Sequence, residues 1–142
     1  MKDGTLGVAI HGAGKVAYAH AASWMKNPHC RIVSVTSRSR ESAQRLADTM
    51  GLRCDVGDDY EAVLGDDRVD IVNLSGPNYV HAQQGIAAAE AGKHLLIEKP
   101  MVLSMEENRR LRDAVAKAGV RSVVSFVLRW NPLLANLKSL LA

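Results

Sequence analysis

Short apolar runs alternate with amphipathic segments along most of the chain. Aliphatic and β-branched residues in the apolar runs predict strands at residues 6–10, 31–36, 53–56, 69–74, 94–97 and 121–128. Apolar residues at helical spacing predict helices at residues 15–26, 41–50, 60–64, 79–91 and 105–118. Strands that alternate with helices form a parallel sheet covered on both faces, which binds ligands at the carboxyl ends of its strands. The pattern therefore predicts a doubly wound α/β fold with a parallel sheet of about six strands.

Residues at the ends of these segments support the predicted boundaries. Pro28 ends the first helix because proline disfavours helical backbone in the residue before it. Gly51 and Gly119 stand where C-cap glycines belong. Ser104 and Glu107 have the spacing of a capping box, so a helix is expected to begin there.

The two ends of the chain depart from the alternation. Residues 1–5 form a short leader, and residues 133–142 begin an amphipathic helix that stops with the chain. Leucines form its apolar stripe, at Leu133, Leu134, Leu137, Leu140 and Leu141. Such an exposed stripe predicts self-association or burial against a partner.

Composition narrows the class of protein. A chain of 142 residues suffices for one domain with a real core. The net charge of +3 is scattered, with no basic stripe among aromatic residues, which argues against nucleic acid as a partner. Without a long apolar run or a leader of the secretory type, we expect a soluble, cytoplasmic protein that does not enter a membrane. Cys30 and Cys54 lack the spacing of metal ligands and are expected to be small, buried or half-buried residues in a reducing compartment.

A glycine turn between the first strand and the first helix carries the main chemical signal. Gly12 permits a sharp turn, and Gly14 has no side chain to keep a pyrophosphate away from the backbone. Unsatisfied N–H groups at the start of the helix offer partial positive charge to an anion. Ala17 occupies the third position of the G-x-G-x-x-G/A pattern, whereas His11 is unusual just before the turn. The stretch predicts a dinucleotide-binding Rossmann unit, although a lone Gly-x-Gly is also common in ordinary turns.

The end of the second predicted strand bears on the choice of cofactor. An NAD site places an acidic residue there, roughly 20 positions after the glycines. This chain has Ser37 and Arg38 instead, which provide a hydroxyl and a guanidinium for a 2′-phosphate. NADP is therefore the first choice and NAD the second; the alternative is a basic, solvated loop.

Four motifs in one order resemble a known family. They are Gly12-Ala13-Gly14, Ser75-Gly76-Pro77-Asn78 with His81, Glu98-Lys99-Pro100, and Arg129-Trp130-Asn131-Pro132. Together they resemble the Gfo/Idh/MocA family, which includes glucose-fructose oxidoreductase and inositol dehydrogenase. The resemblance implies an N-terminal NAD(P)-binding domain at residues 1–128. It also implies that residues 129–142 are the first helix of a C-terminal α/β substrate domain.

The resemblance also implies a role for each motif. The pyrophosphate would be held by Gly12, Ala13, Gly14, Lys15 and Val16, and the adenosine ribose by Ser37 and Arg38. The nicotinamide side would be lined by Ser75, Gly76, Pro77, Asn78, His81, Glu98 and Pro100. Lys99 would reach the reacting centre, where it accepts a proton from the substrate hydroxyl or donates a hydrogen bond to the substrate oxygen.

The expected function is hydride transfer between nicotinamide and a hydroxyl of a sugar, a sugar acid or a cyclic polyol. The chain alone is expected to bind cofactor with little turnover, and the full-length protein to be a homo-oligomer. A non-catalytic dinucleotide-sensing module that acts through a partner is the alternative. A methyltransferase-type nucleotide fold is disfavoured because it leaves Glu98-Lys99-Pro100 unexplained.

Overall fold

Six parallel strands form one sheet in the order β3-β2-β1-β4-β5-β6 within residues 4–141, the part of the chain that the computed structural model describes. The strands are β1 (Leu6–His11), β2 (Cys30–Thr36), β3 (Asp55–Gly57), β4 (Ile71–Leu74), β5 (His94–Glu98) and β6 (Ser122–Ser125). The helices are α1 (Lys15–Met25), α2 (Arg40–Met50), α3 (Tyr60–Leu64), α4 (Asn78–Glu90), α5 (Met105–Ala118) and α6 (Pro132–Leu141), with a 3-10 helix η1 (Val127–Trp130). The strand order reverses between β1 and β4, as in a doubly wound sheet. The predicted Rossmann α/β fold is confirmed.

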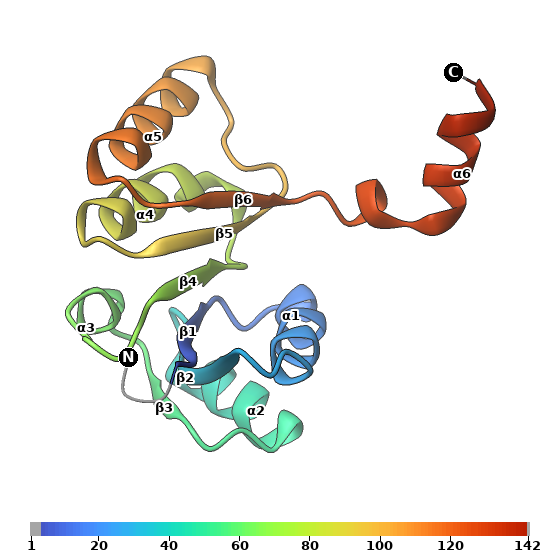
Figure 1. The fold of residues 1–142 in the computed structure, drawn as a ribbon. Helices are drawn as coiled ribbons and strands as arrows, with labels where there is room; N and C mark the ends of the chain where they lie inside the picture. Colours follow the sequence, from blue (N-terminus) through green and yellow to red (C-terminus); the bar gives the residue numbers. More distant parts are fainter. Residues whose placement is uncertain (1–3, 142) are drawn as a thin grey trace.

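Helices cover both faces of the sheet, with α1 and α2 on one face and α3, α4 and α5 on the other (Figure 1). Successive strand residues point to opposite faces. In β1, Val8 and Ile10 pack with residues of α1 and α2, whereas Ala9 packs with residues of α3, α4 and α5. Ala17 of α1 is fully buried in the first of these cores, so the small residue of the glycine pattern lets the helix approach the sheet.

Several predicted boundaries are confirmed by the caps. Gly51 and Gly119 follow α2 and α5 in the left-handed region, with φ values of 63° and 67°. Both bonds of the capping box between Ser104 and Glu107 are present at the start of α5. These features depend on local sequence, which explains why the pattern of residues located them.

The predicted strand at residues 121–128 is wrong at its C-terminal end. β6 stops at Ser125, which pairs with Glu98, the last residue of β5. The next residues therefore have no strand to pair with, and the chain turns into η1 through a bond of 2.8 Å from the Phe126 N–H to the Val124 carbonyl. The β-branched Val127 thus lies in η1, because strand propensity depends on a pairing partner.

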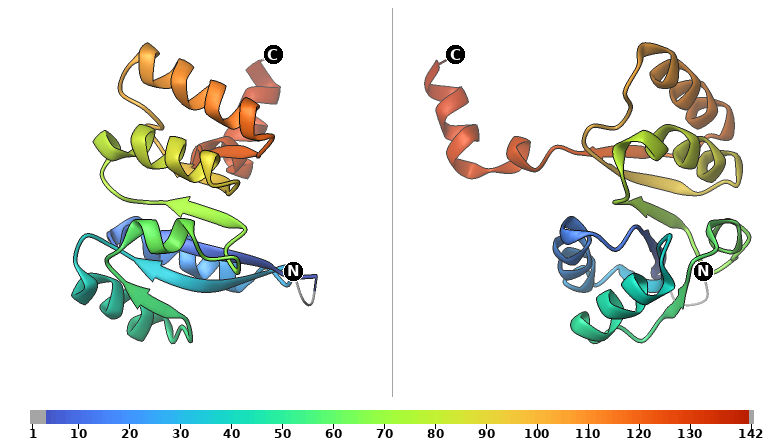
Figure 2. Two further views of the ribbon diagram at one scale, coloured as in Figure 1. Left: turned by 90° about the vertical axis from the view of Figure 1, so that its left-hand side faces the viewer. Right: turned by 180° about the vertical axis from the view of Figure 1, so that it is seen from behind.

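The C-terminal helix α6 projects away from the sheet (Figures 1 and 2). None of its described residues is buried, and the leucine stripe is exposed, with Leu140 at 82%. The predicted exposure is confirmed up to residue 141; residues 1–3 of the leader and Ala142 lie outside the described residues. Between residues 4 and 141, no helix has the length and apolar character needed to span a membrane.

Candidate functional site

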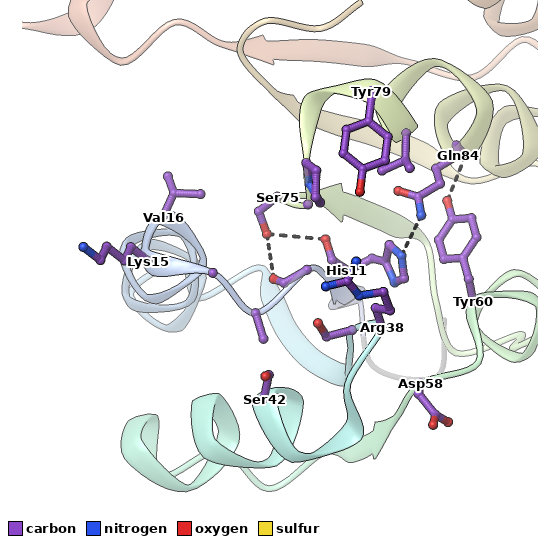
Figure 3. A pocket seen from close by; sticks show the side chains of 17 residues that line it. His11, Lys15, Val16, Arg38, Ser42, Asp58, Tyr60, Ser75, Tyr79 and Gln84 are labelled. Carbon is purple, nitrogen blue, oxygen red and sulfur yellow. Dashed lines mark hydrogen bonds between the residues drawn. The ribbon is translucent and has the colours of Figure 1, made fainter.

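A cavity of about 690 Å³ opens at the carboxyl ends of β1, β2, β3 and β4 (Figure 3). This volume is typical of small-molecule sites, which span roughly 300–1,000 Å³. The lining consists of His11, Gly12, Ala13, Gly14, Lys15, Val16, Ser37, Arg38, Ser42, Asp58, Tyr60, Ser75, Gly76, Pro77, Tyr79, Val80 and Gln84. Its place at the carboxyl edge of the sheet is where a doubly wound fold binds its ligand.

The predicted site residues divide into two groups. Residues 12–16, Ser37, Arg38 and residues 75–77 all line the cavity. Five others lie outside the lining: Asn78, His81, Glu98, Lys99 and Pro100. The structure thus brings together the predicted pyrophosphate and ribose residues and part of the predicted nicotinamide side. We refer below to residues 12–14 as the glycine turn, 75–77 as the serine loop and 98–100 as the lysine loop.

The two glycines of the glycine turn have different surroundings. Gly12 has a φ of +103°, and a Cβ added there would lie 2.4 Å from the backbone nitrogen of Gly76. A Cβ added to Gly14 would meet no atom within 4 Å. Gly14 is also the N-cap of α1, and neither a capping side chain nor an acidic residue occupies that helix start. The turn therefore leaves open backbone and helix N–H groups toward the cavity, which fits a dinucleotide pyrophosphate.

Hydrogen bonds join the serine loop to the glycine turn. The Ser75 hydroxyl donates to the Gly12 carbonyl at 2.9 Å, and the Ser75 N–H donates to the His11 carbonyl at 2.9 Å. The Gly12 N–H in turn donates to the Thr36 carbonyl of β2 at 2.8 Å. Three strand ends are thereby held in one arrangement around the cavity.

The residues predicted to contact the adenosine follow the end of β2. Ser37 is half-buried and Arg38 is exposed, and Figure 3 shows Arg38 pointing toward His11. Ser42 of α2 adds a hydroxyl on the same side. The Lys15 side chain extends away from this group, so the backbone of Lys15 is the part that faces an anion (Figure 3). Asp58 contributes the single carboxylate among the described lining residues.

A buried polar network forms the floor of the cavity beneath the glycine turn. His11 Nδ1 lies 2.9 Å from the Thr36 hydroxyl, and the Gln84 amide donates to His11 Nε2 at 2.9 Å. Since Nε2 accepts, Nδ1 carries the proton and donates to Thr36. The Tyr60 hydroxyl donates to the backbone carbonyl of Gln84, and the ring centroids of Tyr60 and His11 lie 4.3 Å apart. Burial lowers the pKa of His11 to about 4, so this imidazole is neutral at pH 7.

The lysine loop is anchored by a buried contact between Glu98 and a histidine of α1. Glu98 Oε1 lies 3.0 Å from His20 Nε2 of α1, and Glu98 Oε2 accepts a bond from the Lys99 N–H at 3.1 Å. Burial raises the pKa of Glu98, but bonds from the Ser125 hydroxyl, His20 and the Lys99 N–H outweigh it, so the net pKa lies below its usual value. His20 is itself buried, so its ring holds the Glu98 carboxylate from the side of α1. Lys99 itself is exposed, and the Lys99–Pro100 peptide bond is cis.

His81 is a buried bridge between two loops. Its Nδ1 lies 3.0 Å from the Pro100 carbonyl, and its Nε2 lies 3.0 Å from the Gly76 carbonyl. The side chain is 1% exposed, so it supports the serine loop from behind. Asn78 is the exposed first residue of α4.

Sequence reasoning missed part of the lining. The lining residues it did not assign to the site are His11, Ser42, Asp58, Tyr60, Tyr79, Val80 and Gln84. The last three lie on α4, where Tyr79, Val80 and Gln84 sit within two turns of the serine loop. Helical spacing from that loop could have identified them, and the unusual polar His11 could have indicated that polar partners lie nearby.

The sheet order, the glycine turn and the cavity at the carboxyl edge define a Rossmann-type nucleotide-binding architecture. Comparison with known proteins agrees: the family described as "Oxidoreductase family, NAD-binding Rossmann fold" matches residues 6–126. The chain therefore belongs to the Gfo/Idh/MocA oxidoreductase family.

Relatives within this family act on several compounds. Scyllo-inositol 2-dehydrogenase (NAD(+)) of Bacillus subtilis is 34% identical over 131 residues, covering 92% of this chain and 38% of the relative. D-xylose 1-dehydrogenase (NADP(+)) 2 of Haloferax volcanii is 35% identical over 142 residues, covering 100% of this chain and 42% of the relative. The chain thus spans less than half the length of these relatives.

Solved structures are also similar. KijD10, a 3-ketoreductase from Actinomadura kijaniata in complex with NADP, matches with a TM-score of 0.89 and 25% identity, over 96% of this chain and 44% of that chain. Levoglucosan dehydrogenase in complex with NADH and levoglucosan matches with a TM-score of 0.82 and 28% identity, over 88% of this chain and 36% of that chain. The similar proteins therefore include users of both cofactors.

Proposed function

We propose that this chain is the cofactor-binding part of an oxidoreductase that transfers a hydride between nicotinamide and a hydroxyl of a sugar, a sugar acid or a cyclic polyol. The observation that carries the proposal is the open backbone of Gly14 at the start of α1, which lines a cavity of about 690 Å³. The names of the relatives support the substrate class, since they include dehydrogenases of scyllo-inositol, D-xylose and levoglucosan.

The pyrophosphate is held by backbone N–H groups of the glycine turn and of the first residues of α1. Gly12 fixes the turn through its contact with the serine loop, and Gly14 lets the anion approach. Because α1 is not capped by a side chain, the N–H groups of its first two residues, Lys15 and Val16, can donate to the anion, whereas the Ala17 N–H donates to the Gly14 carbonyl. Ser75, Gly76 and Pro77 form the opposite wall, toward the nicotinamide side.

The adenosine end favours NADP over NAD. Ser37 and Arg38 follow β2, where an acidic residue would read the ribose hydroxyls of NAD. A hydroxyl and a guanidinium suit a 2′-phosphate, because Arg donates several charge-assisted hydrogen bonds. Asp58, on the neighbouring strand end, is the group that opposes this preference.

Lys99 is the proposed catalytic residue. A bound nicotinamide supplies the hydride chemistry, and the protein must handle the proton of the substrate hydroxyl. Lys99 is exposed at the end of β5, and its backbone is fixed by Glu98 on one side and by Pro100 on the other. From there its amine accepts the carbinol proton, or its ammonium donates a hydrogen bond to the substrate oxygen.

The isolated chain binds cofactor and turns over little or no substrate. The chain spans less than half the length of its relatives, and each proton-transfer group that lies in the remaining part would contribute ~10²–10⁴-fold in rate. The domain division at residue 128 and the role of α6 as the first helix of a substrate domain agree with the exposed leucines of α6. The full-length protein is proposed to be a homo-oligomer, in which further apolar surface is covered.

Titration of the purified chain with NADPH and NADH, followed by protein fluorescence and thermal unfolding, tests this proposal. Ligand at about 100 times its Kd stabilises the folded chain by about 2.7 kcal/mol. We expect NADPH to bind more tightly than NADH. Absence of stabilisation by either cofactor would contradict the function, whereas tighter NADH binding would contradict only the preference.

Two arginine variants sharpen the cofactor test. Arg38→Ala should weaken NADPH binding about tenfold and leave NADH binding unchanged, because only NADPH carries the 2′-phosphate. Arg40→Ala is the matched control, because this substitution removes the same charge from an exposed residue of α2 that lies outside the cavity lining. Equal effects of the two substitutions would indicate a general charge effect and no specific contact.

A further inference from the structure

His81 joins the two halves of the site through backbone carbonyls. Its Nε2 contacts the Gly76 carbonyl of the serine loop, which lines the cavity, and its Nδ1 contacts the Pro100 carbonyl of the lysine loop, which does not. Both contacts are 3.0 Å long, and the side chain is 1% exposed. One buried ring therefore spans the gap between the cavity wall and the segment that carries Lys99.

The chemistry of the two partners determines what this ring must donate. A carbonyl oxygen only accepts hydrogen bonds, and a neutral imidazole has a single N–H. Both bonds of His81 are therefore made together only when both ring nitrogens carry a proton.

The backbone of Lys99 is consequently held on both sides. On its N-terminal side, the Lys99 N–H donates to Glu98, which is paired with His20 of α1. On its C-terminal side, the Pro100 carbonyl accepts from His81 of α4. Glu98 thus connects Lys99 to α1, whose N-terminus faces the cavity, and His81 connects Pro100 to the serine loop.

We propose that His81 is a positioning residue that couples a dinucleotide in the cavity to the placement of Lys99. The inference rests on the proposed function, since it takes a dinucleotide as the occupant. A ligand that contacts the serine loop fixes the Gly76 carbonyl, and His81 transmits this constraint to Pro100 and hence to the lysine loop. Cofactor binding thereby orders the residue that handles the substrate proton.

The two bonds can be tested without cofactor by long-range ¹H–¹⁵N NMR of the histidine rings. These spectra show for each ring nitrogen of His81 whether it carries a proton, and the two contacts with carbonyl oxygens lead us to expect a proton on both. The spectra of the variants below, in which these resonances are missing, assign them among the five histidines. A ring nitrogen of His81 without a proton would overturn the bridge, because one of the two carbonyls would then face a lone pair.

Two isosteric substitutions separate the two bonds. The amide nitrogen of Asn lies where Nδ1 of histidine lies, so His81→Asn keeps the bond to Pro100 and loses the bond to Gly76. The amide nitrogen of Gln lies where Nε2 lies, so His81→Gln keeps the bond to Gly76 and loses the bond to Pro100. We expect His81→Asn to raise the Kd for NADPH about tenfold and His81→Gln to change it less than about twofold.

The backbone amide resonance of Lys99 reports the coupling itself. In the wild-type chain, saturation with NADPH should shift the amides of both Gly76 and Lys99. In His81→Gln, the Gly76 amide should still shift while the Lys99 amide no longer responds. A Lys99 response at saturation that equals the wild-type response in both variants would overturn the proposal.

A further variant separates the proposed positioning role of His81 from a general destabilisation of α4. Leu111→Ala removes a buried side chain of α5 that packs near Gly85 of α4, without touching either carbonyl. It should lower the unfolding temperature and retain the Lys99 response. If the wild-type chain shows no saturable shift with NADPH or NADH, the proposed function and the coupling both fail, whereas the ring-nitrogen spectrum still decides the two bonds of His81.

Discussion

The glycine turn and the lysine loop are the two chemically distinct ends of the candidate site, and the chain builds them to different degrees. Around the glycine turn, four strand ends supply the walls, and Ser75 and Gly12 are tied together by hydrogen bonds. At the lysine loop the backbone is held by Glu98, yet Lys99 is exposed and lies outside the cavity lining. We therefore expect the described residues to bind a dinucleotide at the glycine turn, whereas Lys99, the proposed catalytic residue, lies outside this cavity.

The same contrast extends to the buried polar groups. Beneath the glycine turn, His11 is neutral and its bonds stay within the cavity floor, to Thr36 and Gln84. Beneath the lysine loop, one oxygen of the Glu98 carboxylate contacts His20, and the other accepts a hydrogen bond from the Lys99 N–H. Polar groups therefore shape a binding surface at one end and orient a reactive residue at the other. The predictions below test whether the two ends can be separated in this way.

The largest effect is expected from Gly12→Ala. A Cβ there would lie 2.4 Å from the Gly76 nitrogen, and the φ of +103° is unfavourable for any other residue. We expect a loss of at least about 4 kcal/mol in the free energy of unfolding, measured by urea denaturation, together with loss of cofactor binding.

Gly14→Ala is the matched control for that substitution. Its added Cβ meets no atom within 4 Å, so the free energy of unfolding should change by less than about 1 kcal/mol. Equal losses in the two variants would mean that the serine loop does not pack against Gly12 as described.

The second effect concerns pH. Burial lowers the pKa of His11 from 6.5 to about 4, so the unfolded chain takes up this proton first as the pH falls. The contribution of neutral His11 to stability is therefore complete above about pH 6.5 and is lost as the pH falls toward about 4. Each pKa unit corresponds to about 1.4 kcal/mol, so the loss approaches about 3 kcal/mol.

His11→Asn isolates this effect. The asparagine amide can still donate to Thr36 but does not titrate, so the variant should lose less stability than the wild type between pH 6.5 and pH 4.5. Urea denaturation across this range measures both proteins. Parallel pH profiles would show that His11 is not held neutral beneath the glycine turn.

The glycine turn and many of the helix ends could be predicted from the sequence, because these features depend on local sequence. The glycine turn, the cap glycines Gly51 and Gly119 and the capping box at Ser104 each depend on residues within a few positions of one another. Tyr60 and Gln84 could not be assigned in that way. They approach His11 from α3 and α4, which are both far from His11 in the sequence. No local pattern of residues indicates such a contact.

For the lysine loop, too, the sequence identified the residues but not the contacts that hold them. The resemblance identified Glu98, Lys99 and Pro100, but only the packing of α1 and α4 against β5 shows what holds them. The end of β6 was mispredicted for a related reason. Val127 has strand propensity, yet β5 ends at Glu98 and leaves it no partner.

A third effect should be confined to binding. Gly14→Asp places a carboxylate at the N-cap of α1, where Asp is favourable and the added side chain has open space. The stability of the free chain should be unchanged or slightly raised. The Kd for either dinucleotide should rise about 100-fold, because the carboxylate occupies helix N–H groups and repels the pyrophosphate. Fluorescence titration measures this, and unchanged affinity would remove the glycine turn from the cofactor site.

The smallest effect is expected from Lys99→Ala. The side chain is exposed and lies outside the cavity lining, so stability should change by no more than about 0.5 kcal/mol. The Kd for NADPH should stay within about twofold of the wild-type value, because the pyrophosphate and adenosine contacts all lie at the other end of the site. The same titration that detects the Gly14→Asp defect measures it. A tenfold rise in the Kd would show that Lys99 contributes to cofactor binding. It would contradict the proposed division of the site into a dinucleotide-binding end at the glycine turn and a catalytic end at the lysine loop.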